Sequence, residues 1–231
     1  MKKTIAAGDV RLPQPLFIFI LCAALFVIGP PIYAQSVESA LERSGYSQPQ
    51  KHSIIAFFAE AEQSEIPPDL LLPKLEEGIA KGIPAPGVLG ALMQEADNLL
   101  RTRGLLLRSE EGRRLLADPA SWARAANLLS VGVAEDEIEQ LIALCGARIE
   151  GFRPASYLYV AVMEWGLSGD SSLDLIGALL SSSIPPDSYM GVMDLLAIGR
   201  RRRIAPEELV QRILQHLGRA KSIKELEKWI Y

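Results

Sequence analysis

The sequence predicts an all-α protein with no β-sheet. Residues that favour strands are sparse, and Thr102 is the only threonine after residue 34. The Asn-Gly and Asp-Gly pairs that mark tight hairpins do not occur. Apolar residues recur instead at the spacing of one helix face. Two segments show this spacing: Leu128, Leu129 and Val131, and Ile138, Leu141, Ile142 and Cys145.

A four-residue turn motif, an apolar residue followed by proline and an acidic residue, recurs along the chain. Its copies are Ile66-Pro67-Pro68-Asp69 and Ile184-Pro185-Pro186-Asp187, looser forms beginning at Ile83, Phe152 and Ile204, and proline-free forms beginning at Val133 and Leu167. Glycine precedes four of them, at Gly82, Gly132, Gly151 and Gly166. A left-handed glycine closes a helix, proline fits the first turn of the next, and an acidic residue there complements the helix dipole. We therefore interpret each copy as a tight connection between two helices, with its apolar residue turned inward.

The spacing of these copies predicts many short helices. Successive copies lie 15 to 20 residues apart, except across one interval of 50 residues. Within that interval Gly104 and the Asp118-Pro119 step provide two further expected breaks. Such short connections favour antiparallel neighbours, stacked as an irregular α-solenoid-like array. A compact multi-helix bundle is the alternative.

The first 34 residues are predicted to be a cleavable secretory signal peptide. Lys2, Lys3 and Arg11 form a basic start, residues 16–28 form an apolar run, and Ala34 offers a small residue at the cleavage point. The apolar run is shorter than the ~20 residues of a spanning helix, which makes an uncleaved anchor the weaker alternative. A lipoprotein is less favoured still, because the bulky Leu21 precedes Cys22. We expect export to the periplasm or the extracellular space.

The remaining chain is expected to comprise residues 35–50, a linker or loosely packed first helix, and residues 51–231, a single all-helical domain. The full chain is 49% hydrophobic and 23% charged, which excludes a disordered tail and a collagenous fibre. Removal of the leader changes the net charge from −4 to −6, with 21 basic against 27 acidic residues. Cys145 is then the only cysteine, so no intramolecular disulfide is expected.

The sequence offers no convergent metal or nucleophile site. His52 and His216 are far apart and belong to no ligand motif, so neither a metal nor a cofactor is predicted. Gly166-Leu167-Ser168-Gly169 has the letters of a nucleophile elbow, but that motif needs a strand before it. Ser168 is interpreted as a helix cap, and Cys145 as a buried apolar residue.

Glu164 is the one weak catalytic candidate. Envelope enzymes that cleave glycans use carboxylates, and a carboxyl group buried beside Trp165 would have a raised pKa. Glu76 and Asp194 lie ten residues after Ile66 and Ile184. A repeated polar helix face explains these acidic residues more simply.

Arg200, Arg201, Arg202 and Arg203 form the strongest charge feature and the candidate binding residues. In an exported protein such a run indicates an anionic envelope partner rather than nucleic acid. A solvated helix end is the simpler alternative, because cations there complement the dipole. A second basic stretch contains Arg101, Arg103, Arg108, Arg113 and Arg114.

These features predict an exported, non-enzymatic helical-repeat protein that presents a binding surface to an envelope protein or peptide. One alternative is a glycan-active envelope enzyme or its helical accessory domain. Another is a binder of anionic lipid or of the membrane surface. The sequence predicts no cofactor and specifies no oligomeric state.

Overall fold

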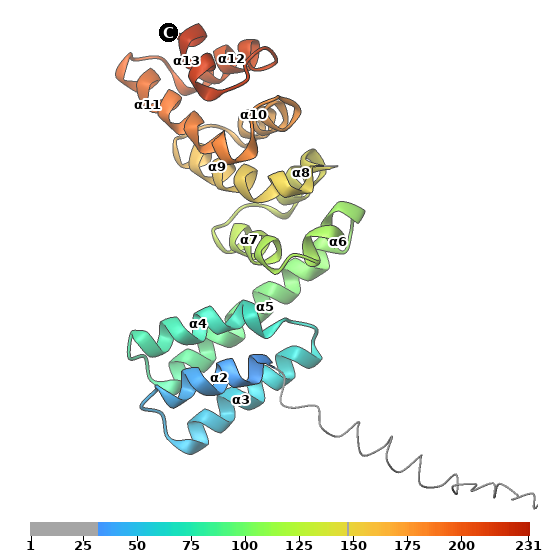
Figure 1. Cartoon of the computed structure of the whole chain (residues 1–231), viewed down its shortest axis with the longest axis vertical. Coiled ribbons are helices and arrows are strands. Elements are labelled where there is room, and N and C mark those ends of the chain that lie inside the picture. The colour runs from blue at the N-terminus through green and yellow to red at the C-terminus, as the bar shows by residue number, and fades with distance from the viewer. Residues whose placement is uncertain (1–31, 147) are drawn as a thin grey trace, which may run out of the picture. The chain divides into compact units, whose positions relative to one another are not determined.

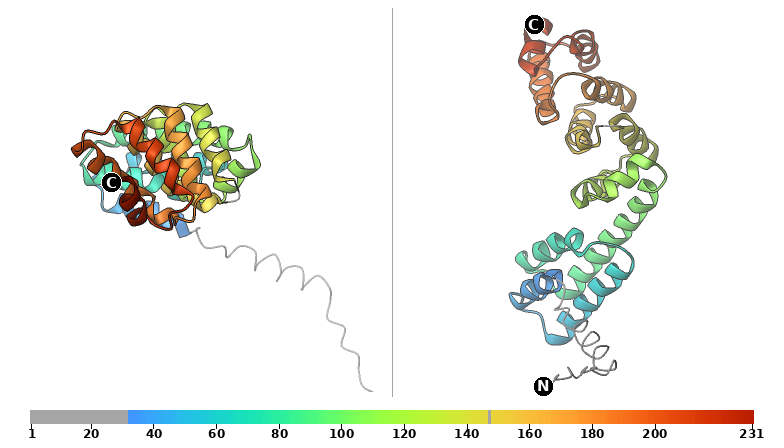
Figure 2. Two further views of the ribbon diagram at one scale, coloured as in Figure 1. Left: turned by 90° about the horizontal axis from the view of Figure 1, so that it is seen from above. Right: turned by 45° about the vertical axis from the view of Figure 1, so that its right-hand side comes forward.

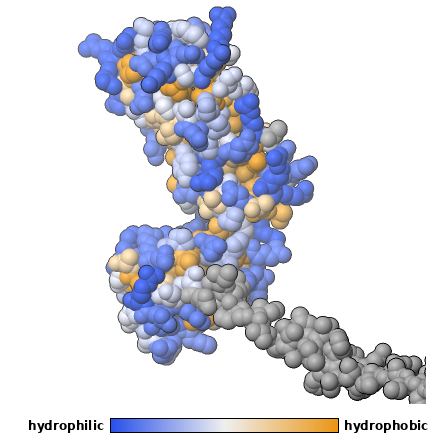
Figure 3. Space-filling view, viewed as in Figure 1, coloured by the Kyte–Doolittle hydropathy of each residue, from blue (hydrophilic) through white to orange (hydrophobic). Residues whose placement is uncertain are grey.

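The computed structural model describes residues 32–146 and 148–231, which form only helices, turns and irregular segments (Figure 1). No strand occurs in these ranges, so the all-α prediction is confirmed. Apart from its last three residues, the predicted signal peptide lies outside the described residues. In the described ranges no helix is long and apolar enough to cross a membrane. On the face shown in Figure 3, apolar residues occur in patches among hydrophilic ones.

The chain divides at Gly45 into two compact units. The described part of the first unit, residues 32–45, contains helix α2 (Ile32–Glu42), in which Val37, Ala40 and Leu41 are buried. The second unit is Tyr46–Tyr231.

The second unit contains eleven α-helices and two short 3-10 helices among its described residues. Its first half comprises α3 (Gln48–Gln63), α4 (Pro68–Ala80), α5 (Ala85–Leu106), α6 (Glu110–Leu116), α7 (Pro119–Ser130) and α8 (Glu135–Cys145). Its second half comprises η1 (Ile149–Gly151), α9 (Phe152–Glu164), α10 (Gly169–Ser181), η2 (Pro186–Gly191), α11 (Val192–Arg201), α12 (Pro206–Leu217) and α13 (Ile223–Ile230).

Helices of the second unit pack mainly against those that follow one or two places later (Figure 1 and Figure 2). Helix α5 packs on α4 and α7, and α10 packs on α8, α9 and α12. Their apolar faces are buried, and Phe152, Tyr159 and Tyr189 are among the largest fully buried side chains. Short helices in the described ranges thus bury their apolar faces against one another, without a central sheet.

The turn motif ends five helices in the same way. The residue before the apolar position has a positive φ at Glu65, Gly82, Gly132, Gly166 and Arg203. The next N–H then bonds a carbonyl five residues back, as from Ile83 to Gly78 (2.9 Å) and from Ile204 to Gly199 (3.0 Å). This is the Schellman arrangement, which satisfies the last carbonyls of a helix. The left-handed glycine prediction is therefore confirmed at Gly82, Gly132 and Gly166.

Three expectations about glycine and proline positions are wrong. Gly151 has φ −75°, and α9 begins directly after it at the buried Phe152. Gly104 lies inside α5, because the buried Leu105 and Leu106 carry the helix on to the next turn. The motif at Ile184 starts a 3-10 helix, and α11 begins only after Gly191, whose close approach to Ile223 leaves little room for a side chain.

Two apolar positions are also more exposed than expected. Ile83 begins a turn motif but is 36% exposed, and Val131 is 55% exposed because α7 ends at Ser130. Ile138, Leu141, Ile142 and Cys145 are buried, as their spacing predicts.

An Arg203→Gly substitution is expected to stabilise the protein by about 1 kcal/mol, because a side chain is strained in the left-handed region. Arg203 has φ 61°. Urea unfolding followed by circular dichroism measures the change. Gly166→Ala, at φ 92°, is the reciprocal variant and should cost a similar amount. Equal stability of Arg203→Gly and the unchanged protein would contradict the strain argument.

Candidate functional site

A pocket of about 340 Å³ opens where α9, α11 and α12 meet. Its lining consists of Glu164, Trp165, Leu196, Arg200, Ile204, Pro206 and Leu209. Both sequence candidates, Glu164 and the arginine run, therefore contribute one residue each to the same pocket. Leu196 and Leu209 are buried and give it an apolar floor.

Two Schellman turns position the charged residues at the mouth of this pocket. Helix α9 ends at Glu164, Trp165 follows as its cap, and the left-handed Gly166 turns the buried Leu167 inward. Helix α11 ends at Arg201. The next turn brings Ile204 and Pro206 to the pocket wall.

Arg200 lies over Trp165, with its guanidinium carbon 5.7 Å from the ring centroid. This separation is within the ~6 Å range of a cation–π contact. None of the ion pairs formed among residues 32–146 and 148–231 includes Arg200. Its exposed planar group lies against an aromatic ring and beside an apolar floor, a setting that suits hydrogen-bond donation to a carboxylate.

Two of the other three arginines of the run, Arg201 and Arg202, have different partners. Arg201 donates to the carbonyl of Ala197 in its own helix (3.4 Å). Arg202 stacks on the Tyr231 ring at 4.5 Å and donates to the carbonyl of the same residue (3.4 Å). Of the four, only Arg200 lines the pocket.

Three arginines of the second basic stretch, Arg101, Arg103 and Arg108, form ion pairs with acidic residues. Arg101 pairs with Glu135 (2.8 Å), and Arg108 pairs with Glu135 (3.1 Å) and Glu139 (2.8 Å). The hydrogen bond from Arg101 is the main cause that lowers the pKa of Glu135. Arg103 pairs with Glu65. The acidic start of α8, interpreted from sequence only as a helix N-terminus, thus also binds arginines from α5 and the turn after it.

Glu164 is exposed, and it is the only carboxylate among the residues that line the pocket. Glu76 and Asp194 are exposed as well, as expected for a repeated polar face. Glycan hydrolysis usually employs two carboxyl groups about 5 to 10 Å apart. The lining of this pocket supplies one.

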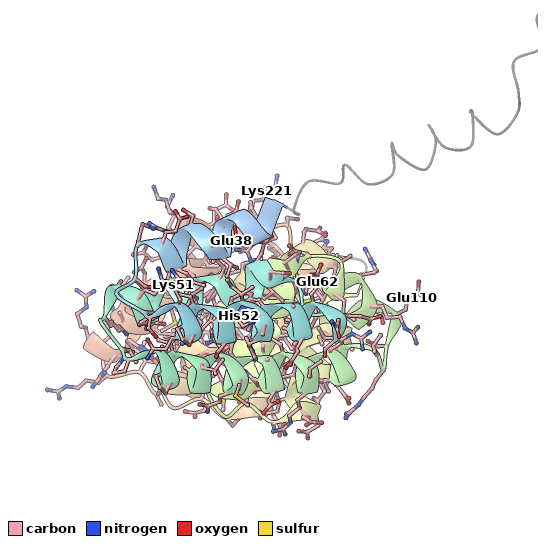
Figure 4. The ribbon with its side chains drawn as sticks, turned by 90° about the horizontal axis from the view of Figure 1, so that it is seen from below. Glu38, Lys51, His52, Glu62, Glu110 and Lys221 are labelled. Carbon is pink, nitrogen blue, oxygen red and sulfur yellow. The ribbon has the colours of Figure 1, made fainter. Side chains whose placement is uncertain are left out.

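The remaining candidate residues, Ser168, Cys145 and His52, are not among the residues that line the pocket. Ser168 caps α10 by accepting from the N–H of Ser171 (3.2 Å). Cys145 is buried, and burial raises its pKa to about 12. His52 lies on α3 beside Lys51 (Figure 4). Within the described ranges, no group of three or more His, Cys, Asp or Glu residues could hold a metal ion.

Sequence reasoning missed the contact between Arg200 and Trp165 and the apolar floor beneath it. Comparison with protein families, with characterised proteins and with solved structures finds no match to the chain.

Proposed function

We propose that the chain is an exported, non-enzymatic helical-repeat protein that binds a protein or peptide segment of the cell envelope. Packing between near neighbours along the chain supports the stacked-array interpretation of the fold. Stacked helices of this kind commonly bind extended segments of other proteins along their surfaces.

The observation that carries the proposal is the setting of Arg200. Its guanidinium faces Trp165 and has no acidic partner among the described residues. Leu196 and Leu209 form an apolar floor beside it. A carboxylate of the ligand would form a charge-assisted, two-pronged hydrogen bond with the guanidinium. A neighbouring apolar side chain of the ligand would cover the floor. We therefore expect a segment in which an acidic residue adjoins an apolar one.

The test is selection from a displayed random-peptide library, followed by fluorescence anisotropy with the selected peptide. The Arg200→Ala variant is expected to bind about 10-fold or more weakly, the loss of one charge-assisted contact. Arg201→Ala removes the same charge from the same helix outside the pocket and should bind as before. Equal binding by both variants, or selection of peptides without acidic residues, would contradict the proposal.

A glycan-active enzyme remains the second candidate because Glu164 and Trp165 line one pocket. Release of soluble fragments from purified cell-wall glycan would support it, provided that Glu164→Gln abolishes the release. The same variant should leave peptide binding through Arg200 within about threefold, because Glu164 is exposed at the pocket mouth.

A further inference from the structure

The exposed side of α5 carries a row of residues spaced alternately three and four positions apart. The row, here called the α5 seam, consists of Gly90, Met93, Asp97, Leu100, Gly104 and, at the C-cap of the helix, Leu107. All six residues are exposed, with Met93 at 54%, Leu100 at 39% and Leu107 at 38%. This spacing is that of residues on a helix face that packs along another helix in a coiled coil.

The two glycines leave gaps between the apolar side chains. A Cβ atom built on Gly90 or Gly104 would meet nothing within 4 Å. Large residues therefore alternate with small or polar ones along the seam. A surface of this form accepts a helix that presents small residues opposite large ones, which is the pattern of the seam itself in reverse order.

We propose that the α5 seam binds the α5 seam of a second copy, with the two helices antiparallel about a two-fold axis between Asp97 and Leu100. Such an axis places Met93 against the partner's Gly104, and Leu107 against the partner's Gly90. Met93 and Leu107 then each fill the gap left by a glycine, and Leu100 lies against the partner's Asp97. The same patch serves on both copies, as in an isologous dimer.

Charge complementarity favours this direction. In the described ranges, the Asp97 side chain has neither an ion pair nor a hydrogen bond. The antiparallel register brings it beside the partner's Arg101. Arg101 is exposed, and its Nε and Nη2 bond Glu135 in its own chain, which leaves Nη1 for Asp97. The two-fold axis generates this pair twice.

A parallel pair would be unfavourable for the same reasons. It would place Asp97 beside the partner's Asp97 at the centre of the seam, where like charges repel. It would also set each glycine against a glycine and leave two layers unfilled. The sequence of the seam is therefore complementary to itself in the antiparallel direction alone.

The seam is about 25 Å long at a rise of 1.5 Å per residue. One helix pair of this length gives a small interface, so we expect a dissociation constant on the order of 10 µM. Sedimentation equilibrium from about 1 to 200 µM should show monomer and dimer in a concentration-dependent ratio. The protein is expressed as the full chain and measured in the form in which it is recovered.

Leu100→Glu should weaken the dimer about 100-fold, because it buries a second acidic group against the partner's Asp97. Val131→Glu is the matched control, since Val131 is an exposed apolar residue off the seam. Circular dichroism checks that both variants remain helical. A monomer throughout the concentration range, or a dimer that is indifferent to Leu100→Glu, overturns the proposal.

Cysteine pairing tests the direction of the helices in a Cys22→Ser background. Met93→Cys mixed with Gly104→Cys should form the mixed disulfide under mild oxidation. Each variant alone should form little disulfide-linked dimer. In the antiparallel pair, the same position on the two copies lies about 16 Å apart along the helix axis, which is beyond the reach of a disulfide. Ready pairing of Met93→Cys with itself indicates a parallel pair and overturns the proposal. Arg200→Ala should leave the dimer unchanged, so the seam and the peptide pocket can fail independently.

Discussion

A Gly112→Ala substitution is expected to destabilise the protein by about 3 kcal/mol, because the added methyl group has no space. Gly112 is buried in α6, where its N–H bonds the capping hydroxyl of Ser109 at 3.0 Å. A Cβ atom there would lie 2.9 Å from the carbonyl carbon of Leu106 and 3.0 Å from its Cα, and closer still to its oxygen. These are backbone atoms at the end of α5, so relief requires that α5 and α6 separate.

Urea unfolding measures the total cost, and amide hydrogen exchange locates it. Protection should fall most in α6 and in the helices that contact it, α5, α7 and α8. Gly218→Ala is the matched control, because its Cβ meets nothing within 4 Å and its φ of −64° suits alanine. Equal stability of the two variants would show that the close approach between α5 and α6 is not required for the stability of the fold.

Arg124→Ala is the second substitution with a large expected effect, again about 3 kcal/mol. Arg124 is only 8% exposed and ties α7 to α9. It donates to the hydroxyl of Ser156 (2.8 Å), to the carbonyl of Ser156 (2.7 Å) and to the side-chain oxygen of Asn127 (2.6 Å). The Tyr157 ring covers it at 4.0 Å. Alanine would leave these acceptors without their donor and open a cavity between the helices.

Arg124→Lys should recover about half of this loss, since an ammonium group replaces the charge but not the planar fork of donors. Arg113→Ala provides the control on the exposed face of α6 and should change the free energy of unfolding by less than about 0.5 kcal/mol. Thermal and urea unfolding of the three variants give the comparison. Similar stability of Arg124→Ala and Arg113→Ala would show that the buried guanidinium contributes little.

The parts of the fold that sequence predicted depend on local chemistry. The glycine before an apolar residue predicted the ends of α4, α7 and α9, because the left-handed conformation is decided within one turn. The predicted helix break at Gly104 was wrong for the opposite reason. Two buried leucines that follow it extend α5, and their burial depends on the packing of other helices against α5.

The candidate site was predicted only as separate residues. Glu164 and Arg200 were candidates because of their residue types and their neighbours in sequence. Their presence in one pocket depends on how α9 packs beside α11. The arginine run looked like one patch because adjacent residues share a charge. Residues two positions apart at a helix end point in different directions, so Arg200 in α11 contacts Trp165 whereas Arg202, the cap of that helix, contacts Tyr231.

The packing of each helix on its near successors also bears on synthesis. A helix of the second unit meets most of its partners within a few dozen residues of chain, so little loop-closure entropy opposes its docking. Folding of this unit can then begin while its last helices are still on the ribosome. If the chain is exported unfolded, the export machinery must bind it before that early structure forms.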